Sequence, residues 1–293
     1  MCSYLSSKKN QMNVLITGAL GFGGRKLNKF LSENASLEMF ASDIHRDAGF
    51  SNYWQCDLLD LESVNTLLLE TKPDFIYHLA GTFSNEFEKD YAANVLAAKN
   101  VLESVRGLKK ECRVMLVGSA AEYGVVVKDE NPIKESRALC PVSVYGLTKV
   151  YQTFLMKYYL NAFNLDIVMA RPFNIYGRGI SNKLFMGKVY QQIQLLKSNK
   201  IDKITLGNLE NERDYISIDE TIKHYVAIMR FGKRGEIYNV GNGLPVRTKA
   251  LLRKVLEEEN VDESLVETAR LERDNVYDVP QIYADITKLK GLR

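Results

Sequence analysis

The chain has 293 residues, a formal net charge of +3, 46% hydrophobic residues and 26% charged residues. This length suffices for one large or two small domains with a buried core. Because Lys and Arg are scattered among Asp and Glu, a nucleic-acid-binding surface is not expected, and no apolar run approaches the roughly 20 residues that span a bilayer.

The polar N-terminus lacks the apolar segment of a signal peptide, so residues 1–12 are predicted to be a disordered leader. The four cysteines form no Cys-x-x-Cys pair and have no His at ligand spacing. We therefore expect neither a metal site nor a disulfide framework, and free thiols of this kind are typical of a cytoplasmic protein.

Short apolar, β-rich segments recur through the first half of the chain, at residues 14–17, 37–43, 75–81, 113–119 and 166–172. Strands that are apolar on both faces are typical of a parallel sheet covered by helices. Helix-like segments lie between them, at residues 23–34, 61–70, 92–105 and from Tyr145 onward. This alternation predicts an α/β fold, a Rossmann-type doubly wound parallel sheet over residues 13–172.

After Arg171 the pattern changes, and loops separate helix-like segments near 183–198, 219–231 and 248–258 from a short strand at 236–241. We interpret residues 173–293 as a smaller C-terminal α/β substrate-binding cap. The two regions are expected to be interleaved, with the strand near 236–241 as a candidate for a return to the main sheet.

Three glycines, Gly18, Gly21 and Gly24, separate the first strand from the first helix in the pattern Gly-x-x-Gly-x-x-Gly. Gly18 permits a tight turn, Gly21 lets the backbone approach a pyrophosphate, and Gly24 lets the helix pack against the strand. The helix N-terminus then offers free N–H groups to a phosphate. An ordinary tight turn would show similar glycines, but their position after the first strand favours dinucleotide binding.

Two acidic residues follow later strands. Asp43 ends the second strand, where a carboxylate can accept hydrogen bonds from the adenosine ribose and repel a 2′-phosphate, which favours NAD. Arg46 could accommodate that phosphate, so NADP stays open. Asp57 could bind the adenine amine, although such an Asp is often only a helix cap. The alternative role of Asp43 is that of a turn residue.

A tyrosine and a lysine lie four residues apart, at Tyr145 and Lys149, which places them on one face of a helix. A neighbouring cation is expected to lower the pKa of the phenol, so that it can exchange a proton with a substrate oxygen. The spacing alone fits an ordinary surface pair equally well. Ser119, at the carboxyl end of the strand at 113–119, favours the catalytic interpretation because ligands of open α/β sheets bind there.

These motifs, with "HLAG", "GSAAEYG", "RPFNIYG" and "RDYISIDE", resemble the extended short-chain dehydrogenase/reductases that act on nucleotide sugars. The resemblance runs from about Asn13 to about Leu289. It implies that Ser119, Tyr145 and Lys149 are catalytic and that Asn94 lies near them. The implied cofactor contacts are Gly18, Gly21, Phe22, Gly24, Asp43, Asp57, Leu58, Leu79, Ala80, Gly81, Tyr145, Lys149 and Pro172. The implied substrate contacts are Ser119, Glu122, Tyr145, Asn174, Arg213, Arg247 and Arg273; for each Arg the alternative is a surface ion pair.

Differences within that family narrow the reaction. Its 4,6-dehydratases carry an Asp–Glu pair after the catalytic hydroxyl residue, where this chain has Ala120 and Ala121. The closest resemblance is to reductases of GDP-4-keto-6-deoxy-D-mannose, which implies NAD(P)H-dependent reduction of a C4 keto group to give GDP-D-rhamnose. An NAD-dependent 4-epimerase stays open, as does a non-enzymatic dinucleotide sensor or scaffold, and the nucleotide base is not fixed.

The resemblance also implies a homodimer formed through the helices that carry Asn94 and Tyr145. Val95, Ala98, Leu102 and Val105 form an apolar stripe on the first of these helices. A stripe of this kind fits core packing as well as it fits a dimer interface.

Overall fold

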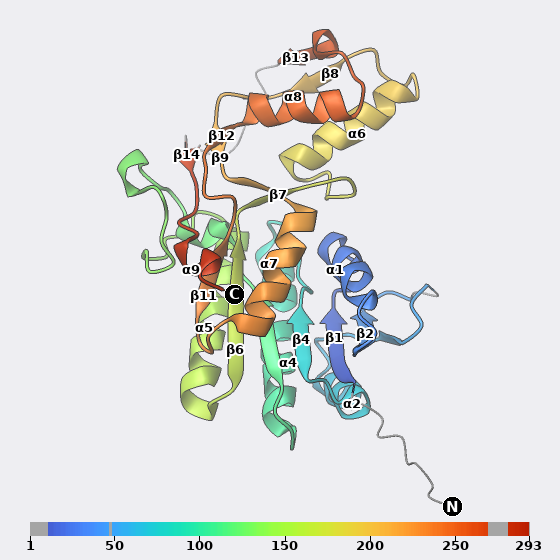
Figure 1. Ribbon diagram of the computed structural model, residues 1–293, viewed down its shortest axis with the longest axis vertical. Coiled ribbons are helices and arrows are strands. Elements are labelled where there is room, and N and C mark those ends of the chain that lie inside the picture. The colour runs from blue at the N-terminus through green and yellow to red at the C-terminus, as the bar shows by residue number, and fades with distance from the viewer. Residues whose placement is uncertain (1–10, 47–48, 269–280, 293) are drawn as a thin grey trace, which may run out of the picture.

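The structure is a computed structural model that describes residues 11–46, 49–268 and 281–292. Most of the leader expected at residues 1–12 lies outside these ranges, but the first strand already begins at Met12. Arg273 also lies outside the described residues. Figure 1 shows a large α/β domain with a smaller group of helices and strands above it.

A seven-stranded sheet, parallel throughout, forms the large domain, in the order β11-β6-β5-β4-β1-β2-β3. Its strands are β1 (Met12–Thr17), β2 (Leu37–Asp43), β3 (Tyr53–Gln55), β4 (Phe75–His78), β5 (Arg113–Val117), β6 (Asp166–Pro172) and β11 (Ile237–Val240). The Rossmann-type fold predicted from the alternating pattern is confirmed. Strand β11 pairs with β6, so a late segment completes the first domain's sheet.

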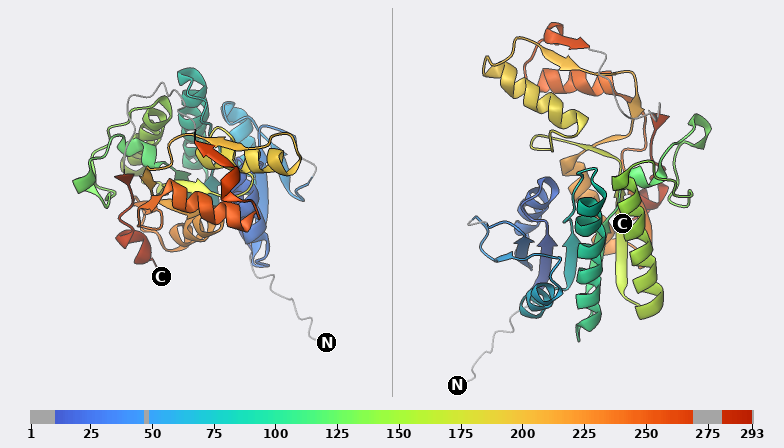
Figure 2. Two further views of the ribbon diagram at one scale, coloured as in Figure 1. Left: turned by 90° about the horizontal axis from the view of Figure 1, so that it is seen from above. Right: turned by 180° about the vertical axis from the view of Figure 1, so that it is seen from behind.

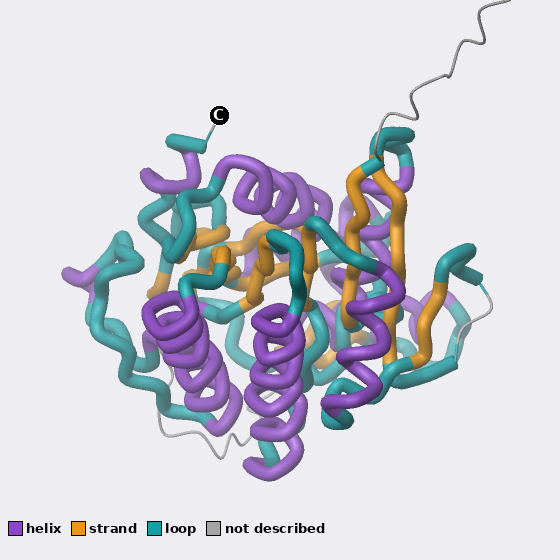
Figure 3. Tube along the Cα trace, turned by 90° about the horizontal axis from the view of Figure 1, so that it is seen from below, coloured by secondary structure: helices purple, strands orange, loops and turns teal. Residues whose placement is uncertain are grey.

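Helices cover both faces of this sheet, as the view from below shows (Figure 3). One face carries α1 (Phe22–Ser32) and α7 (Ile218–Phe231), and the other carries α2 (Leu61–Thr71), α4 (Ala97–Gly107) and α5 (Val144–Phe163). In β1, Val14 and Ile16 pack in the first layer while Leu15 packs in the second. This alternation explains why the strand reads as continuously apolar: both of its faces are buried.

The apolar stripe proposed for a dimer contact or the core belongs to the core. Val95, Ala98, Leu102 and Val105 are all buried, at most 5% exposed. Val95 lies in a π-helical segment (Ala92–Leu96) that joins α3 (Phe87–Tyr91) to α4.

The smaller domain has its own apolar core, to which α6 (Phe185–Lys197) and α8 (Thr248–Glu258) contribute. Figure 2 shows this domain from above and from behind. It also contains β8 (Ile204–Leu206), which pairs with β13 (Val266–Thr268). Short strands connect it to the sheet domain: β7 (Asn174–Tyr176), β9 (Glu212–Arg213), β10 (Tyr215–Ser217), β12 (Val246–Arg247) and β14 (Gln281–Ile282). A short helix, α9 (Thr287–Lys290), closes the described chain against the sheet.

Candidate active site

The turn between β1 and α1 has the geometry of a phosphate cradle. Gly18 has φ +68°, and a Cβ built on it would lie 2.6 Å from the Ala80 nitrogen. Gly21 caps α1 without a side-chain hydrogen bond, and the first turn of α1 carries no acidic residue. Free N–H groups and the positive end of the helix dipole therefore face any anion bound at this turn. These residues fit the pyrophosphate of a dinucleotide.

The segment after β4 lies close both to the helix that follows this turn and to Lys149. A Cβ on Gly23 would lie 3.2 Å from Leu79 Cδ2, and one on Gly81 would lie 2.7 Å from Asn94 Oδ1 and 3.6 Å from Lys149 Nζ. Asn94 is fully buried; its Oδ1 accepts a hydrogen bond from Thr82 N (2.9 Å). Its Nδ2 donates to the Thr82 carbonyl (3.0 Å) and to Thr148 Oγ1 on α5 (2.9 Å). Asn94 thus fastens this segment to α5.

The polar side chains expected around the adenosine form hydrogen bonds within the protein. Asp43 is half-buried at the end of β2, and its Oδ2 accepts a hydrogen bond from Leu20 N in the glycine turn (3.1 Å). Arg46 is exposed and donates to Gln55 Oε1 (3.3 Å). Asp57 Oδ1 accepts from Leu59 N (2.9 Å) and so forms a turn; the helix cap considered as its alternative is taken by Asp60, the N-cap of α2. Leu58 packs in the core between the sheet and α2.

The structure brings Ser119, Tyr145 and Lys149 together at the carboxyl end of the sheet. Ser119 follows β5 and begins a short 3-10 turn, η2 (Ala120–Tyr123), while the other two residues lie in the first turns of α5. A Cβ on Gly146 would lie 2.6 Å from the Ala121 carbonyl oxygen, so only glycine lets α5 approach η2 this closely. Lys149 Nζ lies 5.8 Å from the centroid of the Tyr145 ring.

The expected lowering of the Tyr145 pKa is wrong. Burial raises the pKa of Tyr145 to about 12, although hydrogen bonding with the Ser119 side chain opposes this rise. Burial also lowers the pKa of Lys149 to about 8. Lys149 Nζ donates to the Val117 carbonyl (2.8 Å) and to Gln152 Oε1 (3.2 Å), so its charge is directed to these acceptors. At neutral pH the phenol is therefore a protonated donor.

Glu122 is not placed for the expected substrate contact. Its side chain is fully buried, and one carboxylate oxygen accepts from Ser119 N (2.8 Å). The other oxygen accepts from Thr153 Oγ1 (2.6 Å) and from Arg171 Nη2 (2.8 Å). The family resemblance implied a substrate contact for Glu122. In the structure its carboxylate is instead bound by Arg171, which lies 49 residues further along the chain.

The other described residues expected to contact the substrate lie on the short strands that connect the sheet domain to the smaller domain. Asn174 begins β7 and donates from Nδ2 to the Asp214 carbonyl (3.2 Å). Arg213 is half-buried in β9, which pairs with β12, where Arg247 is 67% exposed and lies 3.6 Å from Glu212. The surface ion pair considered for Arg247 is therefore present.

Comparison with known proteins decides the family. The model of the family described as "NAD dependent epimerase/dehydratase family" matches residues 14–241, more than half of the chain. The chain belongs to this family. The expected family resemblance is thus confirmed.

Relatives within the family catalyse different reactions. The chain is 27% identical over 284 residues to a GDP-6-deoxy-D-talose 4-dehydrogenase of Aggregatibacter actinomycetemcomitans, covering 95% of this chain and 90% of the relative. It is 25% identical over 267 residues to a GDP-6-deoxy-D-mannose reductase of Pseudomonas aeruginosa, covering 89% and 84%. Its fold is similar to that of RMD from Pseudomonas aeruginosa complexed with NADPH, with a TM-score of 0.81, 21% identity and coverage of 96% and 92%.

Two buried ionisable residues, Arg171 and Asp214, were not singled out from the sequence. Arg171 is 1% exposed and donates to Tyr123 OH (2.9 Å) as well as to Glu122. Asp214 is fully buried and accepts three backbone N–H groups, those of Asn242, Gly243 and Ala284. Arg171 lies in a mostly apolar strand, and this is the one local signal in the sequence that indicates a buried, paired charge.

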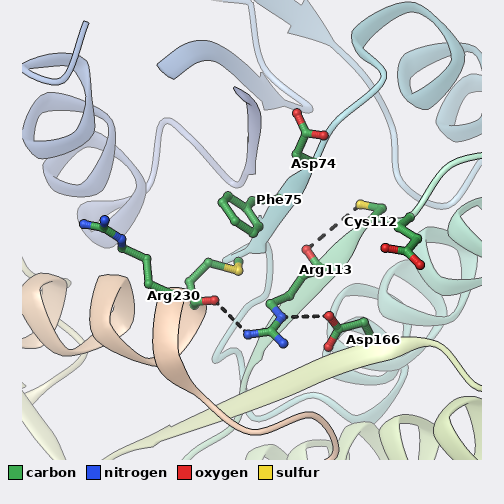
Figure 4. Close-up of a pocket in the computed structure, with 8 residues that line it drawn as sticks. Asp74, Phe75, Cys112, Arg113, Asp166 and Arg230 are labelled. Atoms are coloured by element: carbon green, nitrogen blue, oxygen red, sulfur yellow. Dashed lines mark hydrogen bonds and ion pairs between the residues drawn. The ribbon is translucent and has the colours of Figure 1, made fainter. Parts of the chain in front are cut away.

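A cavity of about 370 Å³ lies at the opposite, amino end of the strands (Figure 4). It is lined by Asp74, Phe75, Glu111, Cys112, Arg113, Asp166, Met229 and Arg230. Arg113 donates to Asp166 (2.9 Å) and to the Met229 and Gly232 carbonyls at the end of α7. These contacts hold α7 against the sheet and are remote from Ser119.

Among the described helices, none is long and apolar enough to cross a membrane.

Proposed function

We propose that this chain is an NAD(P)H-dependent reductase of the C4 keto group of a nucleotide-diphosphate 4-keto-6-deoxy hexose. The substrate we favour is GDP-4-keto-6-deoxy-D-mannose, which would give GDP-D-rhamnose. The observation that carries the proposal is a Ser119–Tyr145–Lys149 centre without an acid–base pair at the two positions after Ser119, Ala120 and Ala121. The relatives named for GDP-6-deoxy-D-talose and GDP-6-deoxy-D-mannose support a GDP-linked 6-deoxy sugar.

The side chains suggest a simple division of labour. The nicotinamide, when bound, supplies the hydride that C4 receives. Tyr145, whose pKa burial raises to about 12, donates its proton to the C4 oxygen. Ser119 donates a hydrogen bond to the same oxygen and fixes its position. Lys149 holds positive charge near the phenol and stabilises the phenolate left after proton transfer.

The cofactor and substrate contacts follow from the same arrangement. We assign the pyrophosphate of the cofactor to the glycine turn and the adenosine ribose to Asp43, while preference between NADH and NADPH stays open because Arg46 is close by in the chain. We assign the nucleotide-sugar diphosphate to Arg213, with Asn174 beside it, because a guanidinium suits phosphate oxygens.

A 4-epimerase is the second candidate. It needs no acid beyond Ser119 and Tyr145, and a UDP-glucose 4-epimerase of Mycolicibacterium smegmatis is among the relatives. A dehydratase is less favoured, although a dTDP-D-glucose 4,6-dehydratase of Dictyostelium discoideum is also a relative. Water elimination requires proton carriers, and alanines at 120 and 121 cannot serve as such. A non-enzymatic sensor or scaffold would have no need of the complete catalytic set.

The test is a panel of GDP-, UDP-, dTDP- and CDP-linked 4-keto-6-deoxy sugars incubated with NADH or NADPH, with products identified by NMR. We expect stoichiometric oxidation of the added cofactor and a 6-deoxy product, and the Tyr145→Phe variant should lose most of this turnover. Cofactor that stays bound during purification, with epimer formation and no net oxidation, would establish the epimerase instead.

We also propose a homodimer. Exposed apolar side chains on α3 and α5, which are Phe87, Tyr151, Phe154 and Tyr158, support a contact through these helices. Light scattering of the purified protein measures the mass directly. A Phe154→Lys variant should shift it toward the monomer, since a charge would be buried in the contact.

A further inference from the structure

The backbone N–H of Ser119 donates a hydrogen bond to the buried carboxylate of Glu122. Glu122 lies three residues further along, in η2, and its Oε1 accepts a hydrogen bond from the Ser119 backbone N–H (2.8 Å). In return, Ser119 Oγ accepts from Ala121 N (3.1 Å). This reciprocal arrangement is a capping box, which fixes the first residue of the turn. The direction in which the Ser119 hydroxyl can point therefore depends on where Glu122 is held.

Glu122 is held by elements that are distant in the sequence. Its second oxygen accepts from Thr153 on α5 (2.6 Å) and from Arg171 on β6 (2.8 Å). Arg171 also donates to Tyr123 OH (2.9 Å), and that hydroxyl donates to Asn239 Oδ1 on β11 (2.6 Å). Every one of these side chains is buried. The turn that carries Ser119 is thereby connected to three neighbouring elements of the sheet domain.

Glu122 packs closely against Gly118, the residue before Ser119. A Cβ on Gly118 would lie 2.4 Å from Glu122 Oε1, so glycine is required just where the carboxylate reaches back to Ser119. Thr153 lies two helical turns after Tyr145 on α5. The same carboxylate therefore contacts both the turn of Ser119 and the helix of Tyr145.

We infer that Glu122, neutralised by Arg171, is a positioning residue that sets the Ser119 hydroxyl relative to the Tyr145 phenol. Glu122 acts through Ser119 and does not contact the substrate. This inference rests on the proposed reductase function for its kinetic readout. The inference predicts that catalysis needs a side-chain oxygen at position 122 that accepts from the Ser119 N–H. The negative charge of Glu122 is needed only to balance the positive charge of Arg171.

Two double variants separate these contributions. E122Q/R171M removes both charges but keeps a carbonyl acceptor for Ser119 N–H, and the new amide can donate to Thr153 once that hydroxyl turns toward Met169 Sδ (3.2 Å). E122M/R171M also removes both charges and has a side chain of similar length, but it offers no comparable acceptor. Both avoid leaving an isolated buried charge, which single variants would create.

We expect E122Q/R171M to keep kcat within about threefold of the parent protein. E122M/R171M should lose roughly 10- to 100-fold in kcat, with the KM for substrate and the Kd for the dinucleotide little changed, because a misplaced catalytic group slows chemistry without weakening binding. Activity is measured well below the melting temperature of each variant, which is recorded separately. Equal kcat values for the two doubles, whether both high or both low, would overturn the inference.

Crystal structures of the two doubles provide a readout without substrate. The Ser119 hydroxyl should keep its place beside Tyr145 in E122Q/R171M and turn away in E122M/R171M; an unmoved hydroxyl in both would refute the positioning role. If the parent protein reduces no 4-keto sugar of the panel, the proposed function fails, and these structures still decide the role of Glu122.

Discussion

Substitution of Gly24 by Ala should damage dinucleotide binding, and Gly23 offers a matched control on the same helix. A Cβ at Gly24 would lie 2.3 Å from the Gly18 carbonyl oxygen and 2.7 and 2.8 Å from backbone atoms of Ala19. All three atoms belong to the glycine turn, so no side chain can move aside. A Cβ at Gly23 would meet only the end of the Leu79 side chain, at 3.2 Å.

The magnitude follows from these contacts. Gly18 O would have to retreat by about 0.9 Å to regain the 3.2 Å that separates it from a Cβ built on Gly21, and overpacking of this kind typically costs about 1–3 kcal/mol. If that cost falls on the bound conformation of the turn, the dissociation constant of the dinucleotide rises roughly 5- to 150-fold. Gly23→Ala should bind normally and gain up to about 1 kcal/mol from helix propensity.

The assay is fluorescence titration of each purified variant with NADH and NADPH, together with thermal unfolding. Weak binding by Gly24→Ala alone, at a temperature where both variants are folded, supports a pyrophosphate cradle at this turn. Binding by Gly24→Ala within about twofold of the parent protein, or equal losses in both variants, would show that the packing around Gly24 does not set the cradle.

Three further predictions concern charge. The kcat/KM for reduction should fall as pH rises through about 8. Burial lowers the pKa of Lys149 to about 8, so its amine is charged below that pH and neutral above it. A flat profile from pH 6 to 10 would contradict this role. Asp43→Asn should shift the ratio of kcat/KM values toward NADPH by removing the repulsion of a 2′-phosphate, whereas Asp57→Asn, a turn residue, should leave the ratio unchanged. Arg213→Met should raise the KM for the nucleotide sugar about tenfold or more, as expected for a lost phosphate contact. Arg247→Met should raise this KM less, because the Arg247 side chain is exposed. A larger rise in KM for Arg247→Met than for Arg213→Met would exchange the roles assigned to the two residues.

The local pattern determined much of the fold in advance. The segments at 37–43 and 166–172 are strands with those bounds, and the helix expected at 248–258 is α8. Burial on both faces makes a parallel strand apolar throughout, so the signal is contained in a few adjacent residues. The same holds for the glycine turn and for Tyr145 and Lys149, whose spacing corresponds to one turn of helix. The short strands of the cap were not predicted, because segments of two or three residues carry no periodicity.

What only the tertiary structure decided were the environments of ionisable groups and the pairings between distant segments. The pKa of Tyr145 is raised because burial disfavours the charged form of the phenol, while Lys149 points its charge at the Val117 carbonyl. Glu122, expected at the substrate, is instead paired with Arg171 inside the protein. Residue types and spacing identify which groups can do chemistry. Desolvation and the position of a partner far away in the sequence set what charge each group carries and where it points, and these exist only once the chain has folded.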